Sequence, residues 1–299
     1  MPELPEVETI KRGLLRLIVG KKIKKIEVEN AGSFLCLDAK FSREIIGHEV
    51  VGVRRRAKVL IIDFVGGLSL VFHLKMTGQI IFRSGGGSLR NDGILVDEKG
   101  FAGGHPTKSM ERELPDKSTR VWFDFGDGKL FFNDERKFGW VRLMKTAAIG
   151  EIAFMKKLGP DFNAEDLRFE IFVERILRHG KSKIKNALLD QTTVAGLGNI
   201  YVDETLNMAR VNPLRLVSDL SSSELLAIFS SARKILARSI ELNGSSWRNY
   251  RDASGERGSY LDEALVYARA GQACRFCGAI IEKIKVNGRG TSFCPKCQA

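Results

Sequence analysis

Four of the five cysteines lie near the end of the chain, in two pairs with the spacing of metal ligands. Cys274 and Cys277 form one Cys-x-x-Cys pair, Cys294 and Cys297 form the other, and 16 residues separate the pairs. Each pair makes a tight turn that directs two sulfurs to one point, so two facing turns can complete a tetrahedron. The pattern favours one structural zinc ion, and two disulfides or a rubredoxin-like iron site are the alternatives.

Pro2 and Glu3 could carry out covalent chemistry at the start of the chain. Removal of Met1 would leave Pro2 with a secondary α-amine, and the α-amine pKa of about 8 leaves far more of it unprotonated at neutral pH than a lysine amine. Such an amine attacks an aldehyde-like carbon to give an iminium ion, an electron sink for later elimination. Glu3 can transfer protons at the same carbon. The simpler alternative is that Pro2 only rigidifies the terminus.

Basic residues at three turns could contact phosphate. Lys58 ends a basic segment, residues 54–58, between two apolar stretches, and Arg289 follows an Asn-Gly turn between the cysteine pairs. Arg136 lies two residues before Phe138, so a cation and an aromatic ring could fill a gap in a base stack. The alternatives are a solvated turn at residues 54–58, an ordinary surface arginine at 289 and a core phenylalanine at 138.

A glycine-rich turn precedes a helix pattern in the second half of the chain. Gly196 and Gly198 come directly before Asn199. Backbone N–H groups at such a helix start can bind a phosphate, although a plain connecting turn has the same pattern.

Charge and composition narrow the class of protein. The 299 residues include 48 Lys+Arg and 36 Asp+Glu, a net charge of +12, with 43% hydrophobic and 28% charged residues. This composition is typical of a folded chain of about two domains and excludes a disordered one. The start of the chain lacks the pattern of an export signal, so we expect a reducing cytoplasm. The excess of positive charge favours a polyanionic partner, nucleic acid first and an anionic membrane second.

The periodicity predicts an α+β fold: an N-terminal antiparallel β-sandwich with a flanking helix, a helical domain and a terminal zinc-binding β-hairpin. Apolar residues at helical spacing predict the first helix over 7–18. Short alternating stretches then predict eight strands: 23–28, 50–55, 59–64, 68–73, 79–82, 121–125, 129–132 and 141–144. Between them, residues 84–118 are expected to form one long flexible loop, because seven glycines lie between Gly85 and Gly104.

The second half changes to helical patterns after a Gly-Pro turn. Helices are expected over 167–178, 184–189, 199–208 and 222–242, and Ser221 with Glu224 forms a capping box before the last of them. We therefore expect a domain over 1–150, a linker over 151–163, a helical domain over 164–270 and a zinc finger over 271–299.

Together these motifs resemble one family, the bacterial formamidopyrimidine-DNA glycosylases with a zinc finger (Fpg/MutM). Leu4 distinguishes the start of the chain from the related endonuclease VIII branch, which begins Pro-Glu-Gly-Pro. The matching motifs run through nearly the whole chain: Met1–Thr9, Arg55–Lys58, His73–Gly78, Asp134–Gly139, Leu188–Tyr201 with its helix–two-turn–helix pattern, and Gly288–Gln298.

The resemblance implies an activity and residue roles. Pro2 would attack C1′ of a damaged nucleotide and expel an oxidised purine such as 8-oxoguanine or a formamidopyrimidine, while Glu3 protonates the sugar ring oxygen. Lys58 would assist β-elimination and Arg289 δ-elimination. The implied cofactor is one structural zinc ion, and the implied partner is damaged double-stranded DNA, bound by a monomer.

The resemblance also implies DNA contacts. Met76, Arg136 and Phe138 would enter the duplex after the damaged base is flipped out. Lys185, Asn199 and Arg289 would hold phosphates around that nucleotide.

Several features depart from the family pattern. Ser118 stands where the family commonly has a DNA-contacting histidine, and the glycine-rich stretch before it is longer than usual. Asn186 and Ala268 replace a common proline and glycine. Two other hypotheses therefore stay open: an endonuclease VIII-like glycosylase for oxidised pyrimidines, and a non-catalytic protein that binds damaged DNA.

Overall fold

The computed structural model divides into two compact units, unit 1 with Met1–Lys156 and unit 2 with Lys157–Ser245 and Ser259–Ala299. The structure describes residues 1–36, 43–85, 88–89, 95–96, 100–105, 107–245 and 258–298. Among these residues, no helix combines the length and the apolar character needed to cross a membrane.

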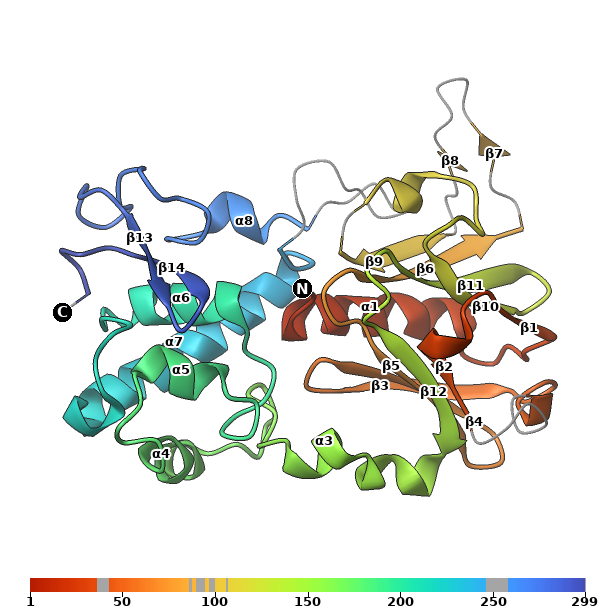
Figure 1. Cartoon of the computed structure of the whole chain (residues 1–299), viewed down its shortest axis with the longest axis horizontal. Helices are drawn as coiled ribbons and strands as arrows, with labels where there is room; N and C mark the ends of the chain where they lie inside the picture. Colours follow the sequence, from red (N-terminus) through yellow and green to blue (C-terminus); the bar gives the residue numbers. More distant parts are fainter. Residues whose placement is uncertain are drawn as a thin grey trace. The chain divides into compact units, whose positions relative to one another are not determined.

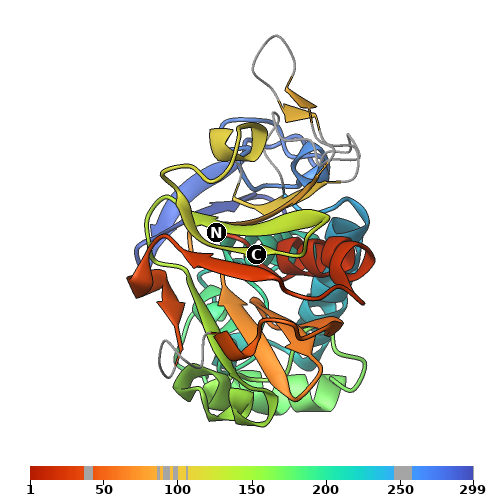
Figure 2. The same cartoon turned by 90° about the vertical axis from the view of Figure 1, so that its right-hand side faces the viewer.

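Unit 1 is built on two five-stranded sheets, seen as separate layers in Figures 1 and 2. Neighbouring strands are antiparallel except for β2 and β12, which pair in parallel. The first sheet has the order β1 (Lys25–Val28), β10 (Thr119–Asp124), β11 (Gly128–Asp134), β6 (Gly78–Ser84), β9 (Phe101–Gly104). The second has the order β2 (Phe34–Leu35), β12 (Trp140–Lys145), β5 (Leu68–His73), β4 (Val59–Phe64), β3 (Val50–Arg56).

The eight strands predicted from alternation are all present, with ends that differ by at most two residues. Glycine turns join two of the strand pairs, because Gly66 and Gly67 between β4 and β5 both have positive φ, as does Gly126 between β10 and β11. The short strand β2 was not predicted, since two residues carry no periodic signal. The described part of the unit also contains three 3-10 helices: η1 (Ala31–Ser33), η2 (Lys108–Glu111) and η3 (Thr146–Glu151).

The flanking helix α1 (Leu4–Ile18) packs against β9 and β3, the last strand of each sheet. Its apolar stripe lies in the core between the sheets, while Gly20 ends the segment with a φ of 83°. β9 and β3 are edge strands of their sheets. The helix therefore covers the side of the sandwich where these two edges lie.

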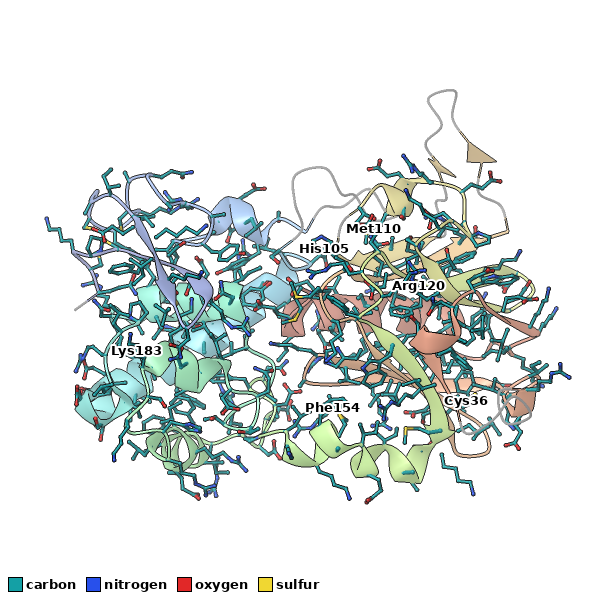
Figure 3. The ribbon with its side chains drawn as sticks, in the orientation of Figure 1. Cys36, His105, Met110, Arg120, Phe154 and Lys183 are labelled. Atoms are coloured by element: carbon teal, nitrogen blue, oxygen red, sulfur yellow. The ribbon has the colours of Figure 1, made fainter. Side chains whose placement is uncertain are left out.

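Residues 84–118 are not one unstructured loop, so that prediction is wrong. Within the described part of this segment, β9 joins the first sheet, η2 follows it, and the short strands β7 (Ser88–Leu89) and β8 (Leu95–Val96) pair with each other. Figure 3 labels His105 and Met110 from this segment. The glycines permit close packing, because a Cβ atom at Gly103 would lie 2.5 Å from Cγ1 of Ile10 on α1.

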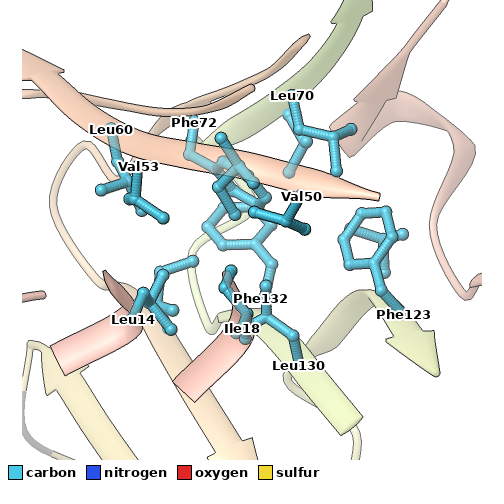
Figure 4. Packing of buried hydrophobic residues seen from close by; sticks show 14 of the residues in the cluster. Leu14, Ile18, Val50, Val53, Leu60, Leu70, Phe72, Phe123, Leu130 and Phe132 are labelled. Carbon is cyan, nitrogen blue, oxygen red and sulfur yellow. The ribbon is translucent and has the colours of Figure 1, made fainter. Parts of the chain in front are cut away.

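The core of unit 1 forms where the two sheets and α1 meet (Figure 4). The ring of Phe72 from the second sheet packs edge-on against Phe123 and Phe132 from the first sheet, with ring centroids 6.2 and 6.0 Å apart. Leu14 and Ile18 of α1 pack into the same fully buried cluster. This packing fixes α1, and with it the start of the chain, relative to both sheets.

Unit 2 contains the four predicted helices and a β-hairpin. The helices are α4 (Phe169–Leu177), α5 (Ile184–Leu189), α6 (Asn199–Met208) and α7 (Ser222–Glu241), followed by the short α8 (Tyr260–Glu263). The hairpin pairs β13 (Glu282–Val286) with β14 (Arg289–Phe293), and η4 (Val217–Asp219) precedes α7. The predicted capping box is confirmed, since the Ser221 N–H donates to Glu224 and the Glu224 N–H to Ser221 Oγ.

The expected linker, residues 151–163, contains a helix that was not predicted, α3 (Ala153–Lys157). The boundary between the units falls inside this segment. The zinc-finger segment belongs to the same compact unit as the helices. The four-part division of the chain stays a prediction.

Substitution Gly104→Ala is expected to destabilise unit 1 by roughly 1–3 kcal/mol. Gly104 has a φ of 113°, and a Cβ atom there would lie 2.4 Å from the carbonyl oxygen of Gly78. The measurement is the midpoint of urea unfolding. Gly150→Ala is the matched control, because Gly150 has an ordinary φ and its added Cβ atom would meet no described atom within 4 Å. Equal midpoints for the two variants would contradict the assigned packing of β9.

Candidate active site and zinc centre

Pro2 and Glu3 are both buried directly before α1, and Glu3 is the N-cap residue of this helix. The backbone N–H of Glu3 donates to the Glu6 carboxylate at 2.8 Å, which caps the first turn of the helix. Glu3 itself is 3% exposed. The nucleophile and the proton donor expected from the sequence are thus carried by a rigid helix end.

Lys58 lies in the two-residue turn between β3 and β4, where Arg56 pairs with Val59. The preceding Ala57 has a φ of 53°, an uncommon conformation for a non-glycine residue, and Arg55 Nη1 donates to its carbonyl oxygen at 3.0 Å. This contact from Arg55 stabilises the turn that presents Lys58.

One ion pair connects that turn to α1. Arg55 Nε donates to Oε2 of Glu8 at 3.0 Å, and both side chains are buried. Burial alone would raise the pKa of Glu8, but hydrogen bonds from Lys11 and Arg55 hold this pKa below its ordinary value. Glu8 is therefore ionised at neutral pH and ties the helix of Pro2 to the hairpin of Lys58.

The three residues expected to enter the duplex come from two loops that Asp134 holds together. The Thr77 hydroxyl donates to Asp134, and the same carboxylate accepts the backbone N–H groups of Arg136 at 3.2 Å and Gly139 at 2.6 Å. Met76, next to Thr77, is 42% exposed.

Phe138 is 54% exposed, and the Arg136 guanidinium lies 4.7 Å from the centre of its ring. The alternative of a core phenylalanine is therefore wrong for residue 138. An apolar side chain and a cation–aromatic pair project from one hydrogen-bonded platform.

Ser118, at the position of the missing histidine, points into the protein. It is 3% exposed, and its hydroxyl bonds to Asp116 Oδ1 at 2.6 Å and to Ser109 Oγ at 3.0 Å. Two residues on, Arg120 Nε donates to the carbonyl oxygen of Asp134 at 2.7 Å. This part of β10 supports the Asp134 platform from inside the sheet.

In unit 2, the structure brings Lys185 and Asn199 to the same backbone oxygen. Lys185 Nζ lies 3.2 Å from the carbonyl oxygen of Gly290, and Asn199 Nδ2 lies 3.0 Å from it. Gly290 follows Arg289 in the hairpin. Lys185 and Asn199, both predicted to bind phosphate, therefore hold the backbone next to Arg289, whose side chain is exposed.

Lys185 is also the cation of a buried ion pair. Its ammonium lies 2.6 Å from Oδ1 of Asp203, and both side chains are at most 1% exposed. The other oxygen of Asp203 accepts the N–H of Ser292 at 2.9 Å. Burial raises the pKa of Asp203 to about 6, opposed by Lys185 and by this N–H, so the carboxylate is ionised at neutral pH.

The four cysteines near the C-terminus converge on one point. All four sulfurs lie within 4.8 Å of one another, and Cys274–Cys297 and Cys277–Cys294 are separated by 3.9 and 3.5 Å. These distances exclude disulfides, whose sulfurs are about 2.05 Å apart. They fit a tetrahedral zinc ion, for which Zn–S bonds of about 2.3 Å place sulfurs about 3.8 Å apart. Because four thiolates leave no open coordination position, the metal is structural.

Gln298 attaches this zinc centre to the helices. Its Oε1 accepts the N–H of Cys294 and the side chain of Asn207, both at 2.8 Å, and its Nε2 donates to the carbonyl oxygen of Val211. At the other end of the hairpin, Asn287 and Gly288 both have positive φ, as a two-residue turn requires.

Sequence patterns identified the candidate site residues but not the contacts that hold them. Glu8 lies within the matching motif Met1–Thr9 but was not assigned a role, and Asp203 lies outside the matching motifs as one more charged residue in a helix. Asp134 lies within a matching motif, and its place directly before Arg136 was the available signal.

Substitution Cys277→Ser is expected to remove the bound zinc, because three thiolates and a hydroxyl bind it far more weakly. Metal analysis should give one zinc per wild-type chain and a clear deficit in the variant. Cys36→Ser is the matched control, since Cys36 lies in unit 1. Full zinc retention by Cys277→Ser would contradict the assigned ligand set.

Breaking the Lys185–Asp203 pair is expected to destabilise unit 2 by roughly 3–5 kcal/mol, because the remaining partner keeps an uncompensated buried charge. The measurement is a double-mutant cycle in urea with Lys185→Met, Asp203→Leu and the double variant. The double variant should lose much less than the sum of the two single losses. Simple additivity would show that the two side chains do not interact.

Comparisons with known proteins were made for the whole chain. Family profiles match the formamidopyrimidine-DNA glycosylase N-terminal domain over residues 1–141 and the formamidopyrimidine-DNA glycosylase H2TH domain over residues 158–251. A third profile, a zinc finger found in FPG and IleRS, matches residues 271–299. The last match agrees with the tetrahedral arrangement of the cysteines and with one structural zinc ion.

Relatives that match over their full length are also named formamidopyrimidine-DNA glycosylase. Formamidopyrimidine-DNA glycosylase of Lactobacillus acidophilus is 38% identical over 100% of this chain and 99% of its own length, and that of Streptococcus pneumoniae is 39% identical with the same coverage.

Among solved structures, a Lactococcus lactis FPG variant in complex with DNA containing Fapy-dG is similar, with a TM-score of 0.84 and 36% identity over 99% of both chains. A structure of MutM with DNA containing carbocyclic 8-oxo-G has a TM-score of 0.82 and 36% identity over 99% of both chains. The domain matches, the full-length identity and the shared fold establish that the chain belongs to the formamidopyrimidine-DNA glycosylase family.

Proposed function

We propose that this chain is a bifunctional DNA glycosylase and AP lyase of base-excision repair that removes oxidised purines from duplex DNA. One observation carries the proposal: Pro2 and Glu3 lie at the capped and buried start of α1, which Glu8 and Arg55 tie to the turn of Lys58. The family membership and the similar structures with Fapy-dG and 8-oxo-G DNA support the substrate class.

In the proposed first stage, the Pro2 amine attacks C1′ of the damaged nucleotide after Met1 has been removed. The N–C1′ bond forms, and the C1′–base bond breaks with its electrons on the departing purine. The nitrogen then loses its remaining proton, and its restored lone pair opens the ring as Glu3 protonates the sugar ring oxygen, which leaves an iminium ion between Pro2 and C1′.

In the second stage, the iminium ion makes the C2′ proton acidic. Loss of that proton and departure of the 3′ phosphate constitute β-elimination, with Lys58 as proton donor and phosphate contact. A further δ-elimination releases the 5′ phosphate, with Arg289 in the corresponding role. The charge of both residues favours the departing phosphates.

We propose separate roles for the remaining DNA contacts. Met76, Arg136 and Phe138 fill the space left by the flipped nucleotide, which offsets part of an unstacking cost of a few kcal/mol. Asn199 contacts phosphate. Lys185, whose ammonium is buried against Asp203 and Gly290, positions the Arg289 strand in place of the direct phosphate contact that the resemblance implies.

The proposal assigns catalysis to residues 1–150, with 151–163 as a linker. It assigns DNA binding to the helix–two-turn–helix domain of residues 164–270 and to the zinc finger of residues 271–299. The enzyme acts as a monomer on DNA in the cytoplasm.

Borohydride reduction is expected to trap wild-type protein covalently on a duplex with 8-oxoguanine opposite cytosine, because it reduces the iminium ion to a stable amine. Pro2→Gly should give at most a small fraction of this adduct, since the secondary amine is lost. The readout is a shifted band on a denaturing gel. Undiminished trapping by Pro2→Gly would exclude Pro2 as the nucleophile.

A parallel thymine glycol duplex tests the substrate class. Faster cleavage of thymine glycol than of 8-oxoguanine would indicate an endonuclease VIII-like enzyme. Binding of both duplexes without cleavage or trapping would indicate a non-catalytic DNA-binding protein.

A further inference from the structure

The additional strand β9 runs along α1 toward the start of the chain. Gly13 of α1 faces the ring of Phe101, since a Cβ atom there would lie 2.5 Å from that ring. Two residues further along β9, Gly103 faces Ile10. β9 therefore runs toward the first turn of α1, and His105 directly follows its last residue, Gly104.

Hydrogen bonds hold the backbone of His105 in this place. Its N–H donates to the carbonyl oxygen of Gly78 at 3.1 Å, and its own carbonyl oxygen accepts from Gln79 Nε2. The same Gln79 nitrogen donates to the Thr107 hydroxyl at 2.8 Å. Figure 3 shows His105 on the side of unit 1 where the chain begins in Figure 1. Its imidazole is half-buried.

Burial and nearby charges act on the protonation of the imidazole. Burial and the positive charge of the Met1 amine lower the pKa of His105 below its ordinary value, while Glu135 and Asp134 oppose this shift. The imidazole is therefore neutral at pH 7 and can accept a proton. The carboxylates of Asp134 and Glu135 disfavour a phosphate next to the imidazole, but they favour an imidazole that has accepted a proton.

The segment of His105 also contacts Ser118, which stands at the position of the family histidine. The Ser118 hydroxyl bonds to Ser109 Oγ, and Ser109 is four residues after His105. The segment that carries His105 is therefore packed against the site of the replacement.

We propose that His105 accepts the proton that the Pro2 nitrogen must lose during attack on C1′. This inference rests on the proposed function. When the amine lone pair bonds C1′ and the purine leaves, the nitrogen carries one hydrogen and a positive charge. Transfer of that proton to the imidazole restores the lone pair, which then expels the ring oxygen as Glu3 protonates it. The new imidazolium is stabilised by Asp134 and Glu135 and releases its proton to solvent.

The test measures single-turnover borohydride trapping on the 8-oxoguanine duplex for the full chain. His105→Gln should lower the trapping rate constant about 100-fold, the lower end of the usual range for general-base catalysis. Its Kd for a duplex with a tetrahydrofuran abasic analogue should equal that of the wild type. His105→Ala should show the same loss and regain rate with added imidazole, which a purely structural role would not produce.

His48→Gln is the matched control and should trap at the wild-type rate, because His48 lies in unit 1 before β3, outside the proposed site. A wild-type rate for His105→Gln, or no effect of imidazole on a slow His105→Ala, overturns the role of His105. Absence of trapping by the wild type itself overturns the proposed function and this inference with it.

Discussion

The packing of α1 between the last strands of the two sheets is the constraint on which the chemistry of unit 1 depends. A nucleophile at a chain terminus is ordinarily mobile, and an amine that moves freely loses the advantage of orientation. Here Leu14 and Ile18 lie in the core, and the buried Glu8–Arg55 ion pair connects the helix to β3. The Glu8 carboxylate accepts hydrogen bonds from its cationic partners. Its buried charge therefore fixes the position of the helix without leaving an unpaired charged group.

In unit 2, the backbone that carries the exposed Arg289 must likewise be held in a fixed position. The four cysteines cross-link the base of the hairpin, but a metal centre alone would not orient the hairpin against the helices. That orientation comes from buried polar contacts: Lys185 and Asn199 on Gly290, Asp203 on Ser292, and Gln298 on Cys294. Polar contacts of this kind are directional, so they define one register where apolar packing would allow several.

Two of the departures from the family pattern, Ser118 and the longer segment before it, fall together in space. Ser118 turns inward to Ser109 and Asp116, and the longer segment before it supplies β9 and His105. A small side chain at one position leaves room for another segment to pack there, so a replacement and an insertion can compensate for each other.

Features that depend on neighbouring residues could be predicted from the sequence alone. Alternation gave the eight strands, helical stripes and the Ser221 capping box gave the helices of unit 2, and Cys-x-x-Cys spacing gave the ligand set, because each signal lies within a few residues. Pro2, Glu3, Lys58 and Arg289 were likewise found from short motifs.

Only the tertiary structure decided what holds those residues. Glu8 and Arg55 are 47 residues apart, Lys185 and Asp203 are 18 apart, and Lys185 and Gly290 are 105 apart, so no periodicity links them. The glycines of β9 suggested a flexible loop, because composition cannot distinguish a glycine that confers freedom from one that permits close packing against a helix. That distinction depends on the distance to a neighbour, and the fold alone determines which neighbour is there.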